Sequence, residues 1–317
     1  MDDKNDCYEE RKNKSVWLPK KENMELPFLA YGFFKPRQLA YHLIKGYVFN
    51  KPKGVTINYN LNHINGMPIL ERNLYEDIWQ VDAYIIEFKH GKEPKAYETI
   101  GLTKNKLVYK WDVISIGGMD VNVLMNASDK SFPIYTYKWQ NYDWRKDPIY
   151  KNTLAYLDIN IAKLKKEFNK DSDEVNNFMR FIEVQSLYRT LWSALNRFLT
   201  FRYGDYLVWN VRKFAEEDFF KTSLEDNYNA LSEQKFYDSD KLDIDWYDTV
   251  YSSEDLKDYE LNPKKPICSA LYYYTLRNNV VHAGKMMPQE VNMVLNALLG
   301  LTEIFRYSLK VVSKKRY

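Results

Sequence analysis

The chain has 317 residues, of which 45% are hydrophobic and 28% are charged, and its formal net charge is +3. This balance is typical of a globular protein and excludes an intrinsically disordered chain. No apolar run reaches the roughly 18–20 residues that a membrane-spanning helix needs. The first 21 residues are charged throughout and contain no apolar core of a secretory signal. Because only Cys7 and Cys268 occur, a disulfide framework is not expected, and we predict a cytoplasmic protein with no membrane partner.

The first half of the chain predicts a polar tail followed by a mixed α+β domain. Residues 1–25 form the predicted tail, and residues 26–125 contain short apolar runs of strand length divided by Gly, Pro and Asn. One helix is predicted over residues 38–45, where apolar side chains share one side. Residues 126–150 combine prolines with scattered aromatic residues and predict a packed connector.

A glycine turn near the start of this domain carries its most informative motif. The sequence F-L-A-Y-G-F-F-K-P-R-Q begins at Phe28, and it predicts a strand, a turn at Gly32 and a helix start led by Pro36. Backbone N–H groups at such a turn can bind an anion or a carboxylate. The motif resembles the Y-G-T-L-(K/R)-P-G-Q opening of γ-glutamylcyclotransferase-like (AIG2-like) domains. The resemblance covers residues 26–125 and implies a small barrel with a ligand pocket at Tyr31, Gly32 and Phe33.

The same domain departs from the enzymes of that family. Members that cyclise γ-glutamyl amines use a glutamate just before a Tyr-x-(Arg/Trp) strand, whereas residues 99–111 contain no carboxylate. Glu98 could replace that glutamate only with a shifted register. We therefore expect a binding or regulatory module that senses a small-molecule or protein trigger without turning it over.

The second half of the chain has helical periodicity and predicts an all-α bundle over residues 151–317. An acidic insertion, residues 216–260, interrupts it with 15 acidic and 4 basic residues, and residues 222–263 are predicted to be irregular. Two interpretations stay open: a solvated insertion, or an acidic flap that competes with RNA for a basic surface. The predicted helices cover residues 152–168, 172–203, 206–220, 266–285 and 289–311.

One predicted helix carries residues suited to phosphodiester chemistry. Arg277 and His282 stand five residues apart, and Asn278 lies one turn before the histidine, where it can orient the imidazole. A histidine titrates near neutrality, and the planar fork of arginine fits phosphate. The small residues after the histidine leave room for a phosphate, which Lys285 can bind.

This R-N-x-x-x-H string resembles the R-x(4–6)-H signature of HEPN domains, which are helical bundles, many of them metal-independent ribonucleases that act as dimers. Upstream, the sequence L-W-S-A-L-N resembles the W-x-x-L-N helix that accompanies this signature in one branch of the family. The resemblance covers residues 150–317. It implies RNA as the substrate, Arg277, His282 and Asn278 as catalytic residues, and Asn196 and Lys285 as RNA-binding residues.

The chemistry favours a two-fold homodimer. In-line cleavage by the substrate's 2′-hydroxyl needs an acid and a base, and each chain supplies one histidine in this motif. The remaining histidines, His42, His63 and His90, have no Cys or carboxylate at ligand spacing, so neither a metal site nor a cofactor is predicted.

The sequence thus predicts an AIG2-like α+β small-barrel domain followed by an all-α HEPN bundle that acts as an endoribonuclease. The pairing resembles prokaryotic antiphage-defence or toxin effectors regulated by a ligand-sensing domain. Two rival hypotheses stay open. One is a non-catalytic RNA- or nucleotide-binding scaffold protein, and the other is a γ-glutamyl-type cyclotransferase with a helical oligomerisation domain.

Overall fold

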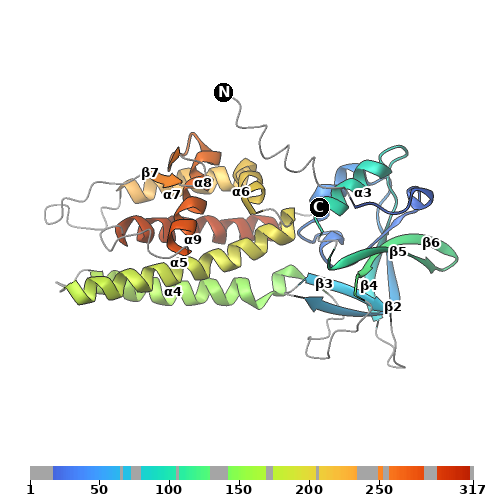
Figure 1. The fold of residues 1–317 in the computed structure, drawn as a ribbon, viewed down its shortest axis with the longest axis horizontal. Helices are drawn as coiled ribbons and strands as arrows, with labels where there is room; N and C mark the ends of the chain where they lie inside the picture. Colours follow the sequence, from blue (N-terminus) through green and yellow to red (C-terminus); the bar gives the residue numbers. More distant parts are fainter. Residues whose placement is uncertain are drawn as a thin grey trace. The chain divides into compact units, whose positions relative to one another are not determined.

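The structure is a computed structural model, and it describes residues 17–64, 67–72, 80–104, 107–128, 142–168, 174–204, 207–233, 249–252, 257–281 and 291–314. Contacts divide the chain into two compact units. Unit 1 comprises residues 1–146, 201–205 and 315–317, and unit 2 comprises residues 147–200 and 206–314. Figure 1 shows the strands of unit 1 and the helices of unit 2.

Unit 1 is built on a closed barrel of five strands. β1 pairs with both β4 and β6, so that the order β1-β4-β2-β3-β6 returns to its start, and β5 pairs with β6 outside this ring. The β1–β6 and β3–β6 pairs are parallel and the other pairs are antiparallel. The strands are β1 (Phe28–Ala30), β2 (Lys53–Ile64), β3 (Met67–Arg72), β4 (Gln80–Ile86), β5 (Tyr109–Ile116) and β6 (Met119–Asn126).

Helix α3 (Glu93–Leu102) supplies the main aromatic anchor of this unit. Tyr97 is fully buried, and its ring makes edge contacts with Phe28, Phe88 and Trp111 at centroid distances of 6.5, 5.4 and 5.4 Å. Its hydroxyl donates to the Leu26 carbonyl oxygen at 2.5 Å, which satisfies the one polar atom that burial removes from water. The core of unit 1 is therefore aromatic and tightly fixed beside β1.

The N-terminal segment joins this core earlier than the sequence suggests. The rings of Trp17 and Trp111 lie 5.5 Å apart, and the Trp111 indole N–H donates to the Trp17 carbonyl oxygen at 3.3 Å. The 3₁₀ turn Lys21–Asn23 follows. The packed chain thus includes residues 17–25, which the sequence analysis assigned to a polar tail.

Gly32 opens the 3₁₀ turn Gly32–Phe34 with φ of +60°, and a Cβ there would lie 2.3 Å from the Pro68 Cγ atom. We expect Gly32→Ala to destabilise the protein by about 2–5 kcal/mol, since left-handed strain costs about 1–2 and overpacking about 1–3 kcal/mol. Urea unfolding measures the loss. Gly91→Ala is the matched control, because its φ is +74° but no atom lies within 4 Å of a Cβ. Equal losses in the two variants would show that the contact with Pro68 is unimportant.

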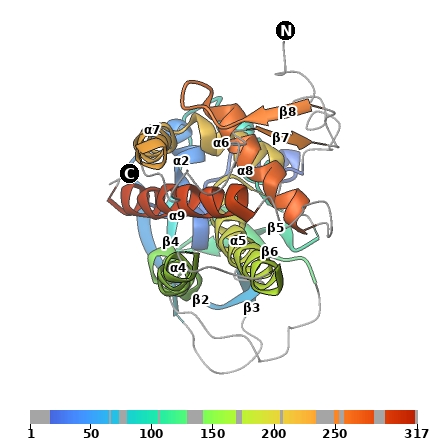
Figure 2. The same cartoon turned by 90° about the vertical axis from the view of Figure 1, so that its left-hand side faces the viewer.

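Unit 2 consists of long helices and one hairpin. Figure 2 shows α4 and α5 nearly end-on, with α9 across them and α7 and α8 beyond α9. The hairpin packs against α8. The elements are α4 (Pro148–Phe168), α5 (Glu174–Tyr203), α6 (Leu207–Glu216), α7 (Asp218–Glu233), β7 (Thr249–Ser252), β8 (Lys257–Glu260), α8 (Pro266–Val281) and α9 (Val291–Lys314).

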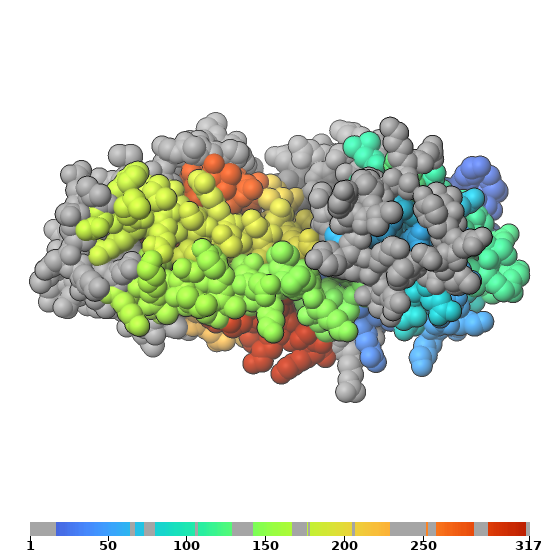
Figure 3. Space-filling view, turned by 90° about the horizontal axis from the view of Figure 1, so that it is seen from below, coloured from blue at the N-terminus to red at the C-terminus, as the bar shows by residue number. Residues whose placement is uncertain are grey.

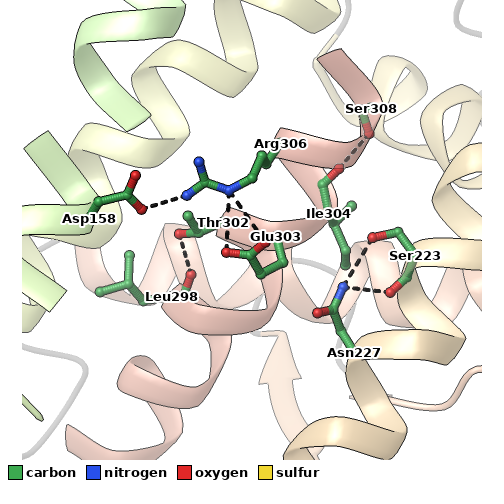
Figure 4. Close-up of polar contacts among 9 residues, drawn as sticks. All are labelled: Asp158, Ser223, Asn227, Leu298, Thr302, Glu303, Ile304, Arg306 and Ser308. Carbon is green, nitrogen blue, oxygen red and sulfur yellow. Dashed lines mark hydrogen bonds and ion pairs between the residues drawn. The ribbon is translucent and has the colours of Figure 1, made fainter. Parts of the chain in front are cut away.

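Polar contacts tie α4 to its neighbours. Asp147, whose side chain is 1% exposed, accepts from the Arg197 Nε atom of α5 at 2.8 Å and from its Nη2 atom at 2.6 Å. This two-pronged geometry favours arginine and fixes α5 against the start of α4. Arg306 of α9 reaches Asp158 of α4 at 2.5 Å, as Figure 4 shows. The Arg306 pair is more exposed and contributes about 1 kcal/mol at most.

The predicted fold class, an α+β AIG2-like small-barrel domain followed by an all-α HEPN bundle, is wrong. Unit 2 contains an antiparallel β-hairpin in which Val250 pairs with Tyr259, and Tyr259 and Leu261 are buried. The acidic stretch concealed these strands, because high charge suggests an irregular segment whereas Thr, Val and Tyr favour strands. The prediction of irregular structure is also incorrect for residues 222–233, 249–252 and 257–260, which belong to α7, β7 and β8. α7 packs along α9.

None of the helices in the described residues has the length and apolarity needed to cross a membrane.

Candidate active site

Helix α8 carries Arg277 and Asn278 of the predicted motif and starts from a closely bonded turn. Pro266 occupies its first position, where a proline costs no helical hydrogen bond. Ser269 and Asn262 bond reciprocally: the Asn262 N–H donates to the serine Oγ at 2.7 Å, and that hydroxyl donates to the Asn262 carbonyl oxygen at 2.8 Å. The residues from Ala270 to Tyr273 are all buried. The apolar run therefore fixes α8 in the interior and sets where Arg277 emerges.

Arg277 is half-buried near the end of α8, and its neighbour holds it. The Arg277 Nη1 atom donates to the Asn278 Oδ1 atom at 2.9 Å, and Asn278 is 9% exposed. The Asn278 side-chain oxygen therefore accepts from the arginine, and the expected contact of Asn278 with His282 lies outside the described residues. His282 and Lys285 lie outside the described residues.

A second arginine reaches the same end of α8. Arg189 of α5 donates a hydrogen bond from Nη2 to the Val280 carbonyl oxygen. Val280 lies in the last turn, where carbonyl groups have no partner within the helix, so a guanidinium is a favourable partner there. Val280 is three residues after Arg277, about 4.5 Å along the helix axis. The contact therefore brings a second permanent positive charge to the segment that leads into His282.

The contacts between α5 and α8 also place Asn196. Arg189 bonds to Val280, while further along α5 the Trp192 ring lies 6.2 Å from that of Tyr274. The two helices therefore run antiparallel, and Asn196 lies further along α5, away from the end of α8 that Arg189 contacts. Its Oδ1 atom accepts from the Thr200 hydroxyl at 3.4 Å. The structure does not bring Asn196 to Arg277.

The sequence analysis chose Asn196 because it used the W-x-x-L-N pattern. Helical spacing is compatible with either Arg189 or Asn196, because Arg189, Trp192 and Asn196 are three and four residues apart and share one face of α5. Only the direction of α8 decides between them, and sequence spacing does not contain that direction.

The buried tyrosines beside α8 are not acids or bases near neutral pH. The Tyr188 hydroxyl donates to the Tyr273 carbonyl oxygen at 2.9 Å. Burial raises the pKa of both Tyr188 and Tyr273, so their phenols stay protonated.

The predicted N-terminal pocket residues are part of the packed core of unit 1. The Tyr31 hydroxyl donates to the Leu124 carbonyl oxygen at 2.5 Å and accepts from the Leu70 N–H at 3.3 Å. Burial raises the pKa of Tyr31. Gly32 abuts Pro68, and Phe33 is 2% exposed.

A carboxylate that the sequence analysis did not single out lies on β3. Glu71 accepts from the side-chain amides of Asn62 at 2.6 Å and of Asn126 at 2.7 Å. Glu98, considered above as a substitute for the family's catalytic glutamate, is exposed on α3. Glu71 pairs with Asn60 across β2 and β3. In the sequence it looks like an ordinary polar residue of a strand, so nothing there marked it as functional.

Within the described part of the chain, no group of three or more His, Cys, Asp or Glu side chains is arranged to hold a metal ion. No protein-family model, curated protein or solved structure matches the chain.

Proposed function

We propose that this protein is a metal-independent endoribonuclease, an effector of the antiphage-defence or toxin type, in which Arg277 binds the scissile phosphate and His282 transfers protons. The observation that supports it best is that two guanidinium groups, those of Arg277 and Arg189, lie at the end of α8 that leads into His282. Guanidinium groups bind phosphate in a two-pronged geometry. The R-N-x-x-x-H resemblance to HEPN ribonucleases supports the same chemistry.

In the proposed reaction the RNA supplies its own nucleophile. The 2′-hydroxyl loses its proton to a neutral imidazole and attacks phosphorus, forming a 2′,3′-cyclic phosphate. The bond to the 5′-oxygen breaks, and that oxygen takes a proton from an imidazolium. Arg277 stabilises the extra negative charge on the pentacovalent phosphorus. DNA, which lacks the 2′-hydroxyl, is not a substrate.

Helix geometry explains why one arginine and one histidine are insufficient. Five residues of ideal helix rotate by about 500°, so this spacing on an ideal helix would separate the two side chains by some 140°. Asn278 holds the Arg277 guanidinium to one side. A second cation from α5 and a second protomer therefore complete the proposed site.

Arg189 provides a direct test of this arrangement. We expect Arg189→Ala to slow RNA cleavage by about 10–100-fold, since a hydrogen bond to a charged group is worth about 1.5–3 kcal/mol. Single-turnover cleavage of an end-labelled RNA measures it. Arg180→Ala, nine residues earlier on α5, is the control and should cleave at the wild-type rate. Equal rates for both variants, with equal thermal stability, would remove Arg189 from the site.

We further propose a homodimer whose contact lies on the outer face of α4 and α5, which Figure 3 shows exposed. The two helices carry five large apolar side chains with exposed fractions from 42% to 71%. Exposed apolar side chains that form a patch mark interaction surfaces. They are Tyr156, Ile159, Phe178, Met179 and Ile182.

The dimer supplies the acid and the base from two His282 residues. Met179→Glu should therefore give a monomer in analytical ultracentrifugation and should lose at least about 10-fold in cleavage, because each site then lacks one proton-transfer group. Lys310→Glu, at an exposed position of α9, is the charge control. A Met179→Glu monomer that cleaves at the full rate would contradict the composite site.

A further inference from the structure

Three aromatic rings of unit 1 surround a single ammonium group. The Lys104 Nζ atom lies 4.2 Å from the Phe33 ring centroid, 5.3 Å from that of Phe34 and 5.7 Å from that of Tyr109. A cation is attracted to the face of an aromatic ring within about 6 Å of its centroid. We call Phe33, Phe34 and Tyr109 the aromatic cage.

The first wall of the cage is fixed without help from the lysine. Phe33 meets the Tyr142 ring edge-on at 4.7 Å and packs against Phe201 of the same unit at 4.4 Å. With 2% of its surface exposed, the Phe33 ring cannot turn away when the cation leaves.

The other two walls are fixed in the same manner. Phe34 meets the Phe28 ring of β1 edge-on at 5.9 Å. The Tyr109 hydroxyl donates to the Pro68 carbonyl oxygen at 2.9 Å, which sets the ring's orientation. The cage is therefore organised before any ligand arrives, and a ligand would not lose free energy in ordering it.

The occupant of the cage is more adaptable than its walls. Lys104 is half-buried, and it directly follows Thr103, the residue that caps α3. A lysine side chain has four rotatable bonds and carries about 2 kcal/mol of rotamer entropy. Release of this side chain would open the cage toward the surface on which the lysine lies.

We propose that the aromatic cage is a binding site for a small alkylammonium group, and that Lys104 is its built-in competitor. Rings that hold one ammonium present the same negative faces to another, and quaternary ammonium groups are the ligands that such cages favour. This site is separate from the chemistry at α8 and does not depend on RNA cleavage. Departure of the lysine from the cage makes the site available.

The competitor sets the expected affinity. A tethered group acts at an effective concentration in the millimolar range, so wild-type protein should bind a free ammonium weakly. Lys104→Ala removes the competitor and should tighten binding of choline by at least about 10-fold. Lys104→Gln, which keeps most of the stem but no charge, should tighten it in the same direction.

Saturation-transfer NMR with choline tests the proposal on the full-length protein. The control variant is Lys110→Ala, which removes an exposed lysine next to Tyr109 and should bind choline as the wild type does. Dimethylbutanol, the neutral isostere of choline, should bind Lys104→Ala much more weakly than choline does. Adding Phe34→Leu to Lys104→Ala should abolish the gain.

Two results would overturn the proposal. One is that folded Lys104→Ala and Lys104→Gln bind choline no more tightly than Lys110→Ala. The other is that dimethylbutanol binds as tightly as choline, because the cavity would then be merely apolar. Neither result bears on RNA cleavage, so the ribonuclease proposal is judged separately.

Discussion

Replacing His282 with alanine is expected to lower the rate of RNA cleavage by at least about 100-fold, the usual effect of losing a general acid or base. The effect should be large because His282 is the one histidine of the motif. Single-turnover cleavage in the presence of EDTA measures the rate without a contribution from free divalent metal.

His90→Ala is the matched control. His90 belongs to unit 1, its side chain is fully exposed, and it lies 3.9 Å from Glu93. Its removal should leave cleavage unchanged. Undiminished cleavage by His282→Ala, or loss of wild-type cleavage in EDTA, would show that a different group performs the chemistry.

Arg277→Lys should lower cleavage by about 10²–10³-fold while the protein remains folded, because losing one donor to a developing oxyanion has that effect. Lysine keeps the positive charge but lacks the planar guanidinium, which can bond to phosphate and to Asn278 at the same time. The same cleavage assay gives the rate, and thermal unfolding confirms that the variant is folded.

Asn278→Ala distinguishes the two proposed functions of the Arg277 guanidinium, which are binding phosphate and bonding to Asn278. It removes the acceptor 2.9 Å from the Arg277 Nη1 atom but leaves the arginine in place. Its loss should therefore be smaller than that of Arg277→Lys. Arg72→Lys, an exposed arginine paired with Asp112 in unit 1, should have no effect. A fully active Arg277→Lys variant would show that Arg277 contributes only its positive charge and not its planar hydrogen-bonding geometry.

Periodicity located the long helices because burial on one side imposes it. Residues 152–168 were predicted helical and α4 spans Pro148–Phe168, while residues 289–311 were predicted and α9 spans Val291–Lys314. The four additional residues at the start of α4 follow Asp147, which accepts from the Ile149 N–H at 3.0 Å. That carboxylate is a helix N-cap that a nearby proline obscured.

Elements held by distant partners were not predictable in this way. β8 reads K-D-Y-E and is mostly charged, and both strands lie in or beside the acidic stretch. Among the residues whose burial is described there, Tyr259 of β8 and Leu261 just after it are buried. Closure of the barrel depends on the parallel pairing of Phe28 with Asn122, residues far apart in the sequence. Local preference contains no information on such a pair.

The candidate site was predictable in its residue types but not in its contacts. The R-N-x-x-x-H string singled out Arg277 and Asn278, and the structure bonds their side chains to each other. Arg189 required the antiparallel direction of α5 and α8, which only tertiary packing sets. The aromatic cage and Lys104 were likewise not predictable, because they come from segments far apart in the sequence that only the folding of unit 1 brings together.

The most direct test of the proposed function is to map a cleavage site in EDTA and then to replace the nucleotide before it with its 2′-deoxy form. We expect wild-type protein to leave a 2′,3′-cyclic phosphate and a 5′-hydroxyl on the RNA, because the substrate's own hydroxyl is the nucleophile. The 2′-deoxy substrate should not be cut at that position. Cleavage of the 2′-deoxy substrate, or a product with a 3′-hydroxyl, would contradict a site built from Arg277 and His282.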